Sequence, residues 1–233
     1  MASLIEQLRA GPLDVQRFGL KLRLHYHRDA CDKKILLHIG GCDSEELDCL
    51  TREMSSCFRF VDVGAHTGLY SLAVKSKCPT ARIVAFEPHP LYCERLAYNV
   101  WTNGLNDFSI RREAVGAENG VSPYYPDHGS LYCIDQRGSG KGRFFNVPVV
   151  PLHDGLQAEG FDGVDALKID IEGYEDRALF PFFDSAPRCM WPRLIIIEHT
   201  LRHWWERDCF KLCAALGYRQ IFAGKVNVVL KLG

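Results

Sequence analysis

The stretch from Phe60 to Leu72, FVDVGAHTGLYSL, constrains the fold more than any other part of the chain. Phe60, Val61 and Val63 form a short β-prone apolar run, which is typical of a parallel strand covered on both faces. Two glycines then allow a tight turn and a close approach of a ligand to the backbone. A helix is expected over residues 69–77. The stretch therefore predicts a strand, a glycine turn and a helix of an open α/β sheet.

A carboxylate stands near the carboxyl end of this strand. Asp62, Gly64 and Gly68 give the spacing D-x-G-x-x-x-G, and ligands of open α/β sheets bind at the carboxyl ends of the strands. The spacing resembles the first motif of class I S-adenosylmethionine (SAM) methyltransferases, in which the turn wraps the methionine end of the cofactor. An ordinary strand-turn-helix with a capping Asp is the alternative. His66 stands where many of these enzymes have a glycine, and its imidazole is a candidate to hydrogen-bond the ligand.

Length and composition favour one soluble α/β enzyme domain. The chain has 233 residues, of which 47% are hydrophobic and 24% are charged, and its formal net charge is −1. This balance gives no electrostatic case for nucleic acid or an anionic membrane. No apolar run approaches the roughly 20 residues that a bilayer span needs, and residues 1–10 lack a signal-peptide core. We expect a cytoplasmic protein without a membrane span, and the oligomeric state stays open.

The spacing of apolar residues predicts the elements that precede the first motif. Alternating apolar residues predict a strand that pairs with a second strand in a hairpin, between two helices. These elements are expected over Ser3–Leu8 (helix), Leu20–Tyr26 and Ile35–Ile39 (strands) and Ser44–Ser56 (helix). Residues 1–57 are therefore expected to be a helix, hairpin and cap segment, followed by a domain over 58–233. The ten cysteines include no C-x-x-C, which favours reduced thiols over a zinc site or disulfides.

Acidic residues also close the next two predicted strands. Arg82–Phe86 ends in Glu87, 25 positions after the first carboxylate, where it is placed to take both ribose hydroxyls of a bound adenosine. A carboxylate at the start of a helix is the alternative. Phe108–Val115 is a third strand and ends near Glu113 and Ala114. In class I methyltransferases an acidic residue with a small neighbour faces the adenine here, so Glu113 is expected to accept from the exocyclic amine and Ala114 to leave room for the ring.

Residues 116–160 interrupt the alternation of helices and strands. Insertions at this place lie over the carboxyl ends of the strands, so we expect this one to cover the substrate. A surface hairpin that packs its own tyrosines is the alternative. The GSGKGR loop over residues 138–143 lacks the G-x-x-x-x-G-K-[ST] spacing of a phosphate-binding loop. The residues expected to line an acceptor pocket are Tyr124, Tyr125, His128 and Tyr132.

The second decisive stretch is ALKIDIEGYE, residues 166–175. It predicts a strand over Ala166–Ile171 that closes in Asp170 and Glu172. The stretch holds three carboxylates within six residues. Unpaired buried charge is costly, so such a group at a strand end indicates a function beyond stability. A fifth strand over Arg193–Glu198 ends in Glu198 and His199. A helix over Trp204–Leu216 and a terminal hairpin over Tyr218–Leu232 complete the expected elements.

Taken together, the motifs FVDVGAHTG, FEP, REAVG, LKIDIEGYE and IIIEH resemble the FkbM-like family of SAM-dependent methyltransferases, and LKIDIEGYE is the specific one. The resemblance implies a doubly wound, mostly parallel seven-stranded sheet with an antiparallel terminal hairpin strand, Rossmann-like in architecture. The family usually has Asn at the position of His66. The resemblance implies SAM contacts at Asp62, Gly64, Gly68, Glu87, Glu113 and Ala114.

Family members of known role methylate hydroxyl groups on sugars or polyketide-type products. The resemblance therefore implies O-methylation of a small-molecule or glycan acceptor, with Asp170 and Glu172 at the transfer centre and no required metal. A hydroxyl is a poor nucleophile until its proton leaves, so a base is expected among Asp170, Glu172 and His199. Ribose 2′-O methylation of RNA is an alternative, but it needs an inner lysine and residues 177–188 contain none. A non-catalytic SAM-binding module is the other alternative.

Overall fold

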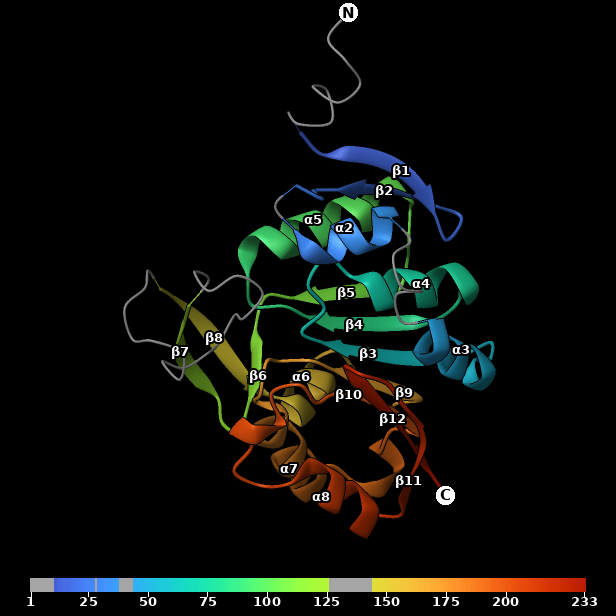
Figure 1. Ribbon diagram of the computed structural model, residues 1–233. Helices are drawn as coiled ribbons and strands as arrows, with labels where there is room; N and C mark the ends of the chain where they lie inside the picture. Colours follow the sequence, from blue (N-terminus) through green and yellow to red (C-terminus); the bar gives the residue numbers. More distant parts are fainter. Residues whose placement is uncertain (1–10, 28, 38–43, 126–143) are drawn as a thin grey trace, which may run out of the picture.

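Seven strands form the central sheet, in the order β11-β12-β10-β9-β3-β4-β5 (Figure 1). The computed structural model describes residues 11–27, 29–37, 44–125 and 144–233. Strand β12 is antiparallel to both of its neighbours, and the other strands are mutually parallel. The expected doubly wound, Rossmann-like sheet with its antiparallel terminal hairpin strand is therefore confirmed. Its strands are β3 (Arg59–Val63), β4 (Arg82–Phe86), β5 (Phe108–Arg111), β9 (Ala166–Ile169), β10 (Leu194–Glu198), β11 (Tyr218–Ala223) and β12 (Asn227–Leu232).

Helices cover both faces of this sheet, because alternate strand residues point to opposite sides. Phe60 packs into the cluster under α3 and α4, whereas Val61 packs into the cluster under α6, α7 and α8. Phe60 and Val61 are both apolar, as expected for a sheet that is buried on both faces. The helices are α3 (Ser44–Glu53), α4 (Leu69–Lys77), α5 (Pro90–Thr102), α6 (Leu152–Ala158), α7 (Glu175–Ser185) and α8 (Cys209–Ala215).

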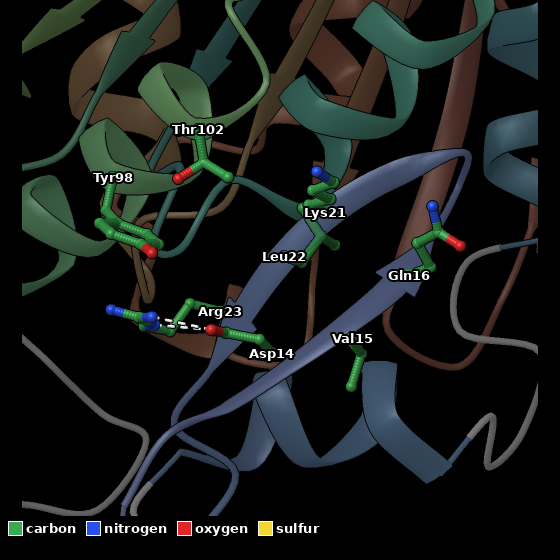
Figure 2. A pocket seen from close by; sticks show the side chains of 8 residues that line it. All are labelled: Asp14, Val15, Gln16, Lys21, Leu22, Arg23, Tyr98 and Thr102. Atoms are coloured by element: carbon green, nitrogen blue, oxygen red, sulfur yellow. Dashed lines mark hydrogen bonds and ion pairs between the residues drawn. The ribbon is translucent and has the colours of Figure 1, made fainter.

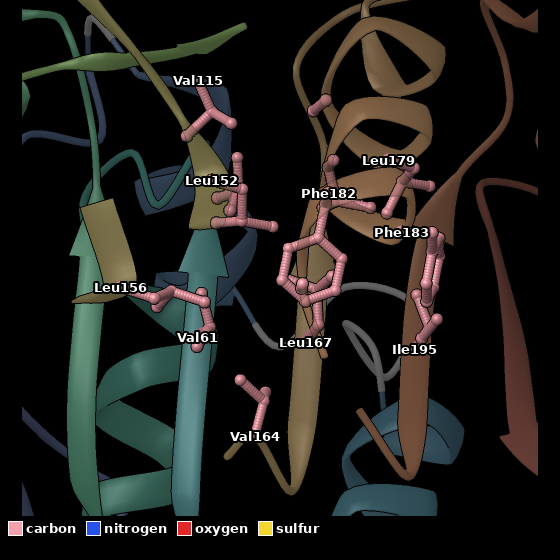
Figure 3. Packing of buried hydrophobic residues seen from close by; sticks show 14 of the residues in the cluster. Val61, Val115, Leu152, Leu156, Val164, Leu167, Leu179, Phe182, Phe183 and Ile195 are labelled. Carbon is pink, nitrogen blue, oxygen red and sulfur yellow. The ribbon is translucent and has the colours of Figure 1, made fainter. Parts of the chain in front are cut away.

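The largest apolar cluster lies between the sheet and the helices α6 and α7 (Figure 3). Phe182 of α7 points toward the strands, and Leu156 of α6 lies across from it beside Val61. Phe182, Leu156, Leu167 and Ile195 are each 1% exposed or less. This packing fixes the strands whose carboxyl ends carry the candidate site residues.

The amino-terminal hairpin differs from the prediction. Strand β2 (Leu20–Leu24) pairs with β1 (Leu13–Arg17), and residues 35–37 of the expected partner strand belong to the helix α2 (Ala30–Leu37), whereas residues 38–39 lie outside the described ranges. The prediction of a strand over Ile35–Ile39 is therefore wrong. A cap at its start favours the helix: the carboxylate of Asp29 accepts from the backbone N–H of Asp32 at 3.1 Å, which satisfies a free donor of the first turn.

Two further elements are shorter than predicted. The third strand stops at Arg111, and residues 114–116 form β6 of a separate sheet with the order β6-β8-β7, where β7 is Gly120–Tyr124 and β8 is Phe145–Pro151. The helix expected over Trp204–Leu216 is a 3₁₀ turn, η2 (Arg202–Trp204), followed by α8. Asp208 separates them because its carboxylate caps α8. The expected Ser3–Leu8 helix, His128, Tyr132 and the GSGKGR loop lie outside the described residues.

No helix within the described ranges is long and apolar enough to cross a membrane. The seven cysteines whose side chains are described have free thiols: Cys49, Cys57, Cys78, Cys93, Cys189, Cys209 and Cys213.

Truncation of the core side chain between sheet and helix should be costly. Phe182→Ala should lower the free energy of unfolding by about 3–5 kcal/mol, because it removes a fully buried ring and leaves a cavity. Trp101→Ala is the control, since Trp101 is 76% exposed, and it should change the unfolding free energy by less than about 0.5 kcal/mol. Urea denaturation of the two variants measures both values, and equal losses would contradict the packing described here.

Candidate functional site at the carboxyl ends of the strands

The turn after β3 is organised by the carboxylate of Asp62. This side chain is buried, and one of its oxygens accepts from the Ser71 hydroxyl at 2.6 Å and from the Ser71 backbone N–H at 3.2 Å. Gly68 is the N-cap of α4 and has no side chain to do this, so Asp62 caps the helix from the preceding strand. The second oxygen, Oδ1, has no hydrogen-bond partner among the described residues. Burial raises the pKa of Asp62, against the opposing effects of Lys168 and Ser71.

The two glycines of the turn allow approaches that a side chain would block. Gly64 has φ +75°, and a Cβ there would overlap the carbonyl oxygen of Asp170. Gly68 has φ +86°, and a Cβ there would overlap the side chain of Leu96. The turn therefore lies directly against the end of β9 and against α5. Its backbone is also tied to β4, because Gly64 and Ala65 both donate to the carbonyl of Phe86.

A buried lysine joins the ends of β3 and β9. Lys168 lies opposite Asp62 in the parallel register, so the two side chains share one face of the sheet. The Lys168 ammonium donates to the Gly64 carbonyl at 3.0 Å, and it lies 3.4 Å from Asp170 Oδ2 and 3.8 Å from Asp62 Oδ1. Lys168 is not among the site residues predicted from the sequence. The signal was a lysine inside an apolar strand, since lysine is rarely buried without a partner.

Glu87 lies at the end of β4 and is 4% exposed. One carboxylate oxygen accepts from the backbone N–H of His66 at 2.8 Å and the other from that of His89 at 2.8 Å. Burial raises the pKa of Glu87 to about 7, although these hydrogen bonds oppose the rise. His66 has a positive φ of +53°, and its ring stacks on Tyr92 with the centroids 3.8 Å apart. Glu87 therefore holds the glycine turn as well as the start of α5.

A second group of carboxylates surrounds the end of β9. The Asp170 side chain is 32% exposed, whereas Glu175 and Glu198 are buried. Burial, together with the charges of Asp170, Glu198 and Glu175, raises the pKa of Glu172 to about 8. Glu172 therefore carries a proton at neutral pH in this structure. Its backbone has φ +56°, so the chain turns sharply at this residue.

Glu175 supports this turn through hydrogen bonds, and Glu198 lies at the end of the neighbouring strand. Glu175 accepts from the backbone N–H groups of Ile171 and Gly173 and from the Trp205 indole N–H at 2.6 Å. Burial raises the pKa of Glu175 to about 7. One oxygen of Glu198 accepts from Thr200, and Oε2 has no partner among the described residues. Burial also raises the pKa of Glu198, and the Asp170 charge adds to this rise.

His199 follows β10, and its ring turns toward the terminal hairpin. Nε2 lies 3.3 Å from the carbonyl oxygen of Gly224. A carbonyl only accepts, so this hydrogen bond requires the proton on Nε2 and leaves the lone pair on Nδ1. The structure thus gathers Asp62, Lys168 and Asp170, with Glu172 and Glu198 electrostatically coupled to Asp170, and it ties His199 to the hairpin beside them.

The predicted adenine contacts lie at the start of the small sheet. Glu113 accepts from the Arg111 guanidinium at 2.5 Å, and the same guanidinium pairs with Glu159 at 3.0 Å. Ala114 is buried in a cluster with Tyr124 and Val147. Tyr124 and Tyr125 are 3% and 9% exposed, and the Tyr124 ring lies 5.8 Å from that of His89 and 5.2 Å from that of Phe145 between centroids. The described residues contain no group of three or more His, Cys, Asp or Glu side chains suited to hold a metal ion.

A separate cavity of about 360 Å³ lies between the hairpin β1–β2 and α5 (Figure 2). The ion pair between Arg23 and Asp14, 2.7 Å long, lies along it, with Tyr98 and Thr102 of α5 on its other side. None of the predicted site residues lines this cavity. The strand-end residues are a better candidate site because their charged groups converge there.

Glu172 should make stability depend on pH. Its pKa rises from an ordinary value of 4.5 to about 8 on folding, so the folded state binds the proton more tightly. The stabilisation by the protonated form is complete below about pH 4.5 and is lost as the pH rises through about 8. Glu172→Gln cannot ionise, so the variant should gain stability relative to wild type between pH 5 and pH 8. Urea denaturation at both pH values measures this, with the exposed Glu118→Gln as control. A difference from wild type that does not change with pH would contradict the raised pKa of Glu172.

A family model and several curated proteins match part of this chain. The model of the methyltransferase FkbM domain matches residues 62–219. Methyltransferase sdnD of Sordaria araneosa is 30% identical over 49% of this chain and 56% of that protein, and Methyltransferase 1 of Beauveria bassiana is 27% identical over 49% and 54%. The chain thus aligns with just over half the length of these curated relatives.

Among solved structures, TYW2 of M. jannaschii in complex with AdoMet is similar in fold, with a TM-score of 0.50 over 94% of this chain and 84% of that chain, at 16% identity. At this identity the similarity shows the fold alone. The family match covers more than half of the chain and runs from Asp62 in β3 to Arg219 in β11. The chain therefore belongs to the FkbM methyltransferase domain family.

Proposed function

We propose that this protein is a SAM-dependent methyltransferase that methylates a hydroxyl group on a sugar or a natural-product-like small molecule. The observation that carries the proposal is the family match over residues 62–219. That range contains every strand end at which the predicted site residues lie. Membership of the family supports methyl transfer, and the known acceptors of family members support a hydroxyl group.

The residues at the strand ends fit SAM, which would supply a methyl group activated on a positively charged sulfur. Gly64 and Gly68 let the turn pack directly against Asp170 and Leu96, so the turn lies beside the end of β9. Asp62 Oδ1 has no hydrogen-bond partner among the described residues. The cofactor also carries an ammonium group, and buried carboxylates suit such a cation.

Glu87 is the proposed partner of the ribose. Each of its carboxylate oxygens accepts one backbone N–H, from His66 and from His89. A carboxylate oxygen can accept about two hydrogen bonds, so each oxygen retains the capacity to accept one ribose hydroxyl. Glu113 and Ala114 are the proposed neighbours of the adenine, and Arg111 holds the Glu113 carboxylate in place.

Asp170 is the proposed base. About a third of its side chain is exposed, whereas Asp62 on the neighbouring strand is buried. The Lys168 ammonium 3.4 Å away holds the orientation of the Asp170 carboxylate. Proton acceptance there would leave the acceptor oxygen free to attack. Glu172 carries a proton at neutral pH, since its pKa is about 8, so its role would be to donate a hydrogen bond to the acceptor. His199 is the reserve base, through Nδ1.

A direct test combines cofactor binding with methyl transfer. Wild type should bind SAM in calorimetry and should transfer labelled methyl groups to members of a panel of hydroxylated sugars and polyketides. Asp170→Asn keeps the shape of the side chain but removes its charge. The kcat of this variant should fall by about 100-fold, with SAM affinity within about threefold of wild type. Asp184→Asn, at an exposed position of α7, is the matched control.

Three outcomes would contradict this proposal. Folded wild type that binds no SAM at millimolar concentration would exclude the cofactor. Transfer to RNA with none to small molecules would reassign the acceptor class. Near-full turnover of Asp170→Asn together with loss of turnover in His199→Ala would move the base to His199.

A further inference from the structure

The amino-terminal segment, here the described residues between 11 and 37, precedes the residues that match the family model. It nevertheless shares a buried core with the glycine turn. Leu22 and Leu24 of β2 and Ile35 of α2 pack in one cluster with Ala65 of the turn. In Figure 1 the hairpin and α2 lie against α5.

Asn99 of α5 and Asn103, the residue that follows this helix, fix the hairpin in this place. Asn103 accepts from the backbone N–H of Lys21 at 2.8 Å and donates to its carbonyl at 2.7 Å. Asn99 accepts in the same way from the N–H of Arg23 at 2.8 Å. The two side chains satisfy the free edge of β2, as a neighbouring strand would. The position of the segment is therefore set by directed hydrogen bonds as well as by apolar packing.

Two carboxylates of this segment reach the glycine turn. Asp32 accepts from the Thr67 hydroxyl at 3.0 Å and from the backbone N–H of His25 at 2.6 Å. Asp29 pairs with Arg95 at 3.0 Å, and its carboxylate lies 3.5 Å from His66 Nε2. Asp29 and Asp32 are 6% and 1% exposed. Burial of two carboxylates is costly, and burial with the Asp29 charge raises the pKa of Asp32 to about 6.

These contacts continue to the proposed ribose partner. Thr67 and His66 are adjacent in the turn, and the backbone N–H of His66 donates to Glu87 at 2.8 Å. His66 has a positive φ of +53° at this point, a conformation that residues other than glycine rarely adopt. Asp29 lies beside the side chain of His66, and Asp32 accepts from the side chain of Thr67.

We propose that Asp29 and Asp32 are positioning residues of the cofactor site, which hold the turn at His66 and Thr67 so that Glu87 is oriented for SAM. This inference rests on the proposed function for the identity of the cofactor. It extends the site beyond the residues that match the family, to a segment that contacts the turn but none of the predicted catalytic residues.

The test uses the full chain and two readouts. Asp32→Ala removes both hydrogen-bond acceptors, so the Kd for SAM in calorimetry should rise about tenfold. Hydrogen exchange of the peptide that covers residues 64–68 should become faster in the same variant without any cofactor present. Asp32→Asn should restore both values to within about twofold, because an amide can accept from His25 and donate to Thr67.

Asp14→Ala is the matched control, since Asp14 lies on β1 of the same amino-terminal segment but is 63% exposed at its side chain. It should leave both readouts unchanged. If Asp32→Ala does not fold, Thr67→Val removes the same hydrogen bond from the other side and should give the same two effects, and Thr67→Ser should reverse them.

Wild-type exchange and wild-type Kd in folded Asp32→Ala would overturn the inference, as would losses in Asp32→Asn equal to those in Asp32→Ala. Absence of SAM binding by wild type would contradict the proposed function instead. The exchange measurement would still decide whether Asp32 holds the turn.

Discussion

The site depends on the position of the Lys168 ammonium, which lies between the Gly64 carbonyl and the carboxylates of Asp62 and Asp170. It donates to the Gly64 carbonyl and lies within 4 Å of Asp62 and Asp170. Without this cation, two carboxylates would face each other across β3 and β9 with no opposite charge, and buried unpaired charge is among the most costly features of a protein interior. The parallel register places Lys168 opposite Asp62, so the sheet itself builds the pair. The glycine turn and the end of β9 are held together as a result.

Two of the four non-glycine residues with a positive φ in the described part of the chain lie at the same place. His66 and Glu172 have positive φ values, and they follow β3 and β9. Such conformations cost about 1–3 kcal/mol each and persist only where the surroundings compensate. Glu87 compensates at the first turn by accepting from His66, and Glu175 does so at the second by accepting from Ile171 and Gly173. Each strained turn therefore has its own buried carboxylate, which explains why acidic residues accumulate at this edge of the sheet.

The sheet could be predicted from the sequence because its strands are short, apolar and closed by acidic or glycine residues. The helix over residues 69–77 agrees with its prediction to the residue. Residues 35–39 could not be assigned from periodicity, because a short apolar run suits a helix as well as a strand. The cap formed by Asp29 is local, but an Asp in a polar run indicates a turn as readily as the start of a helix. The contacts of Asp32 with the glycine turn are tertiary, and Lys168 acquires its partners only through strand register, so spacing along the chain carries neither of these two signals.

A crystal structure of the protein with S-adenosylhomocysteine tests the central claim most directly. The account predicts that the ligand lies at the carboxyl ends of β3 and β4, with its ribose hydroxyls on Glu87 and its amino-acid end beside Gly64 and the Lys168 cluster. A ligand in the cavity between the β1–β2 hairpin and α5, or one that makes no contact with Glu87 and the glycine turn, would contradict it.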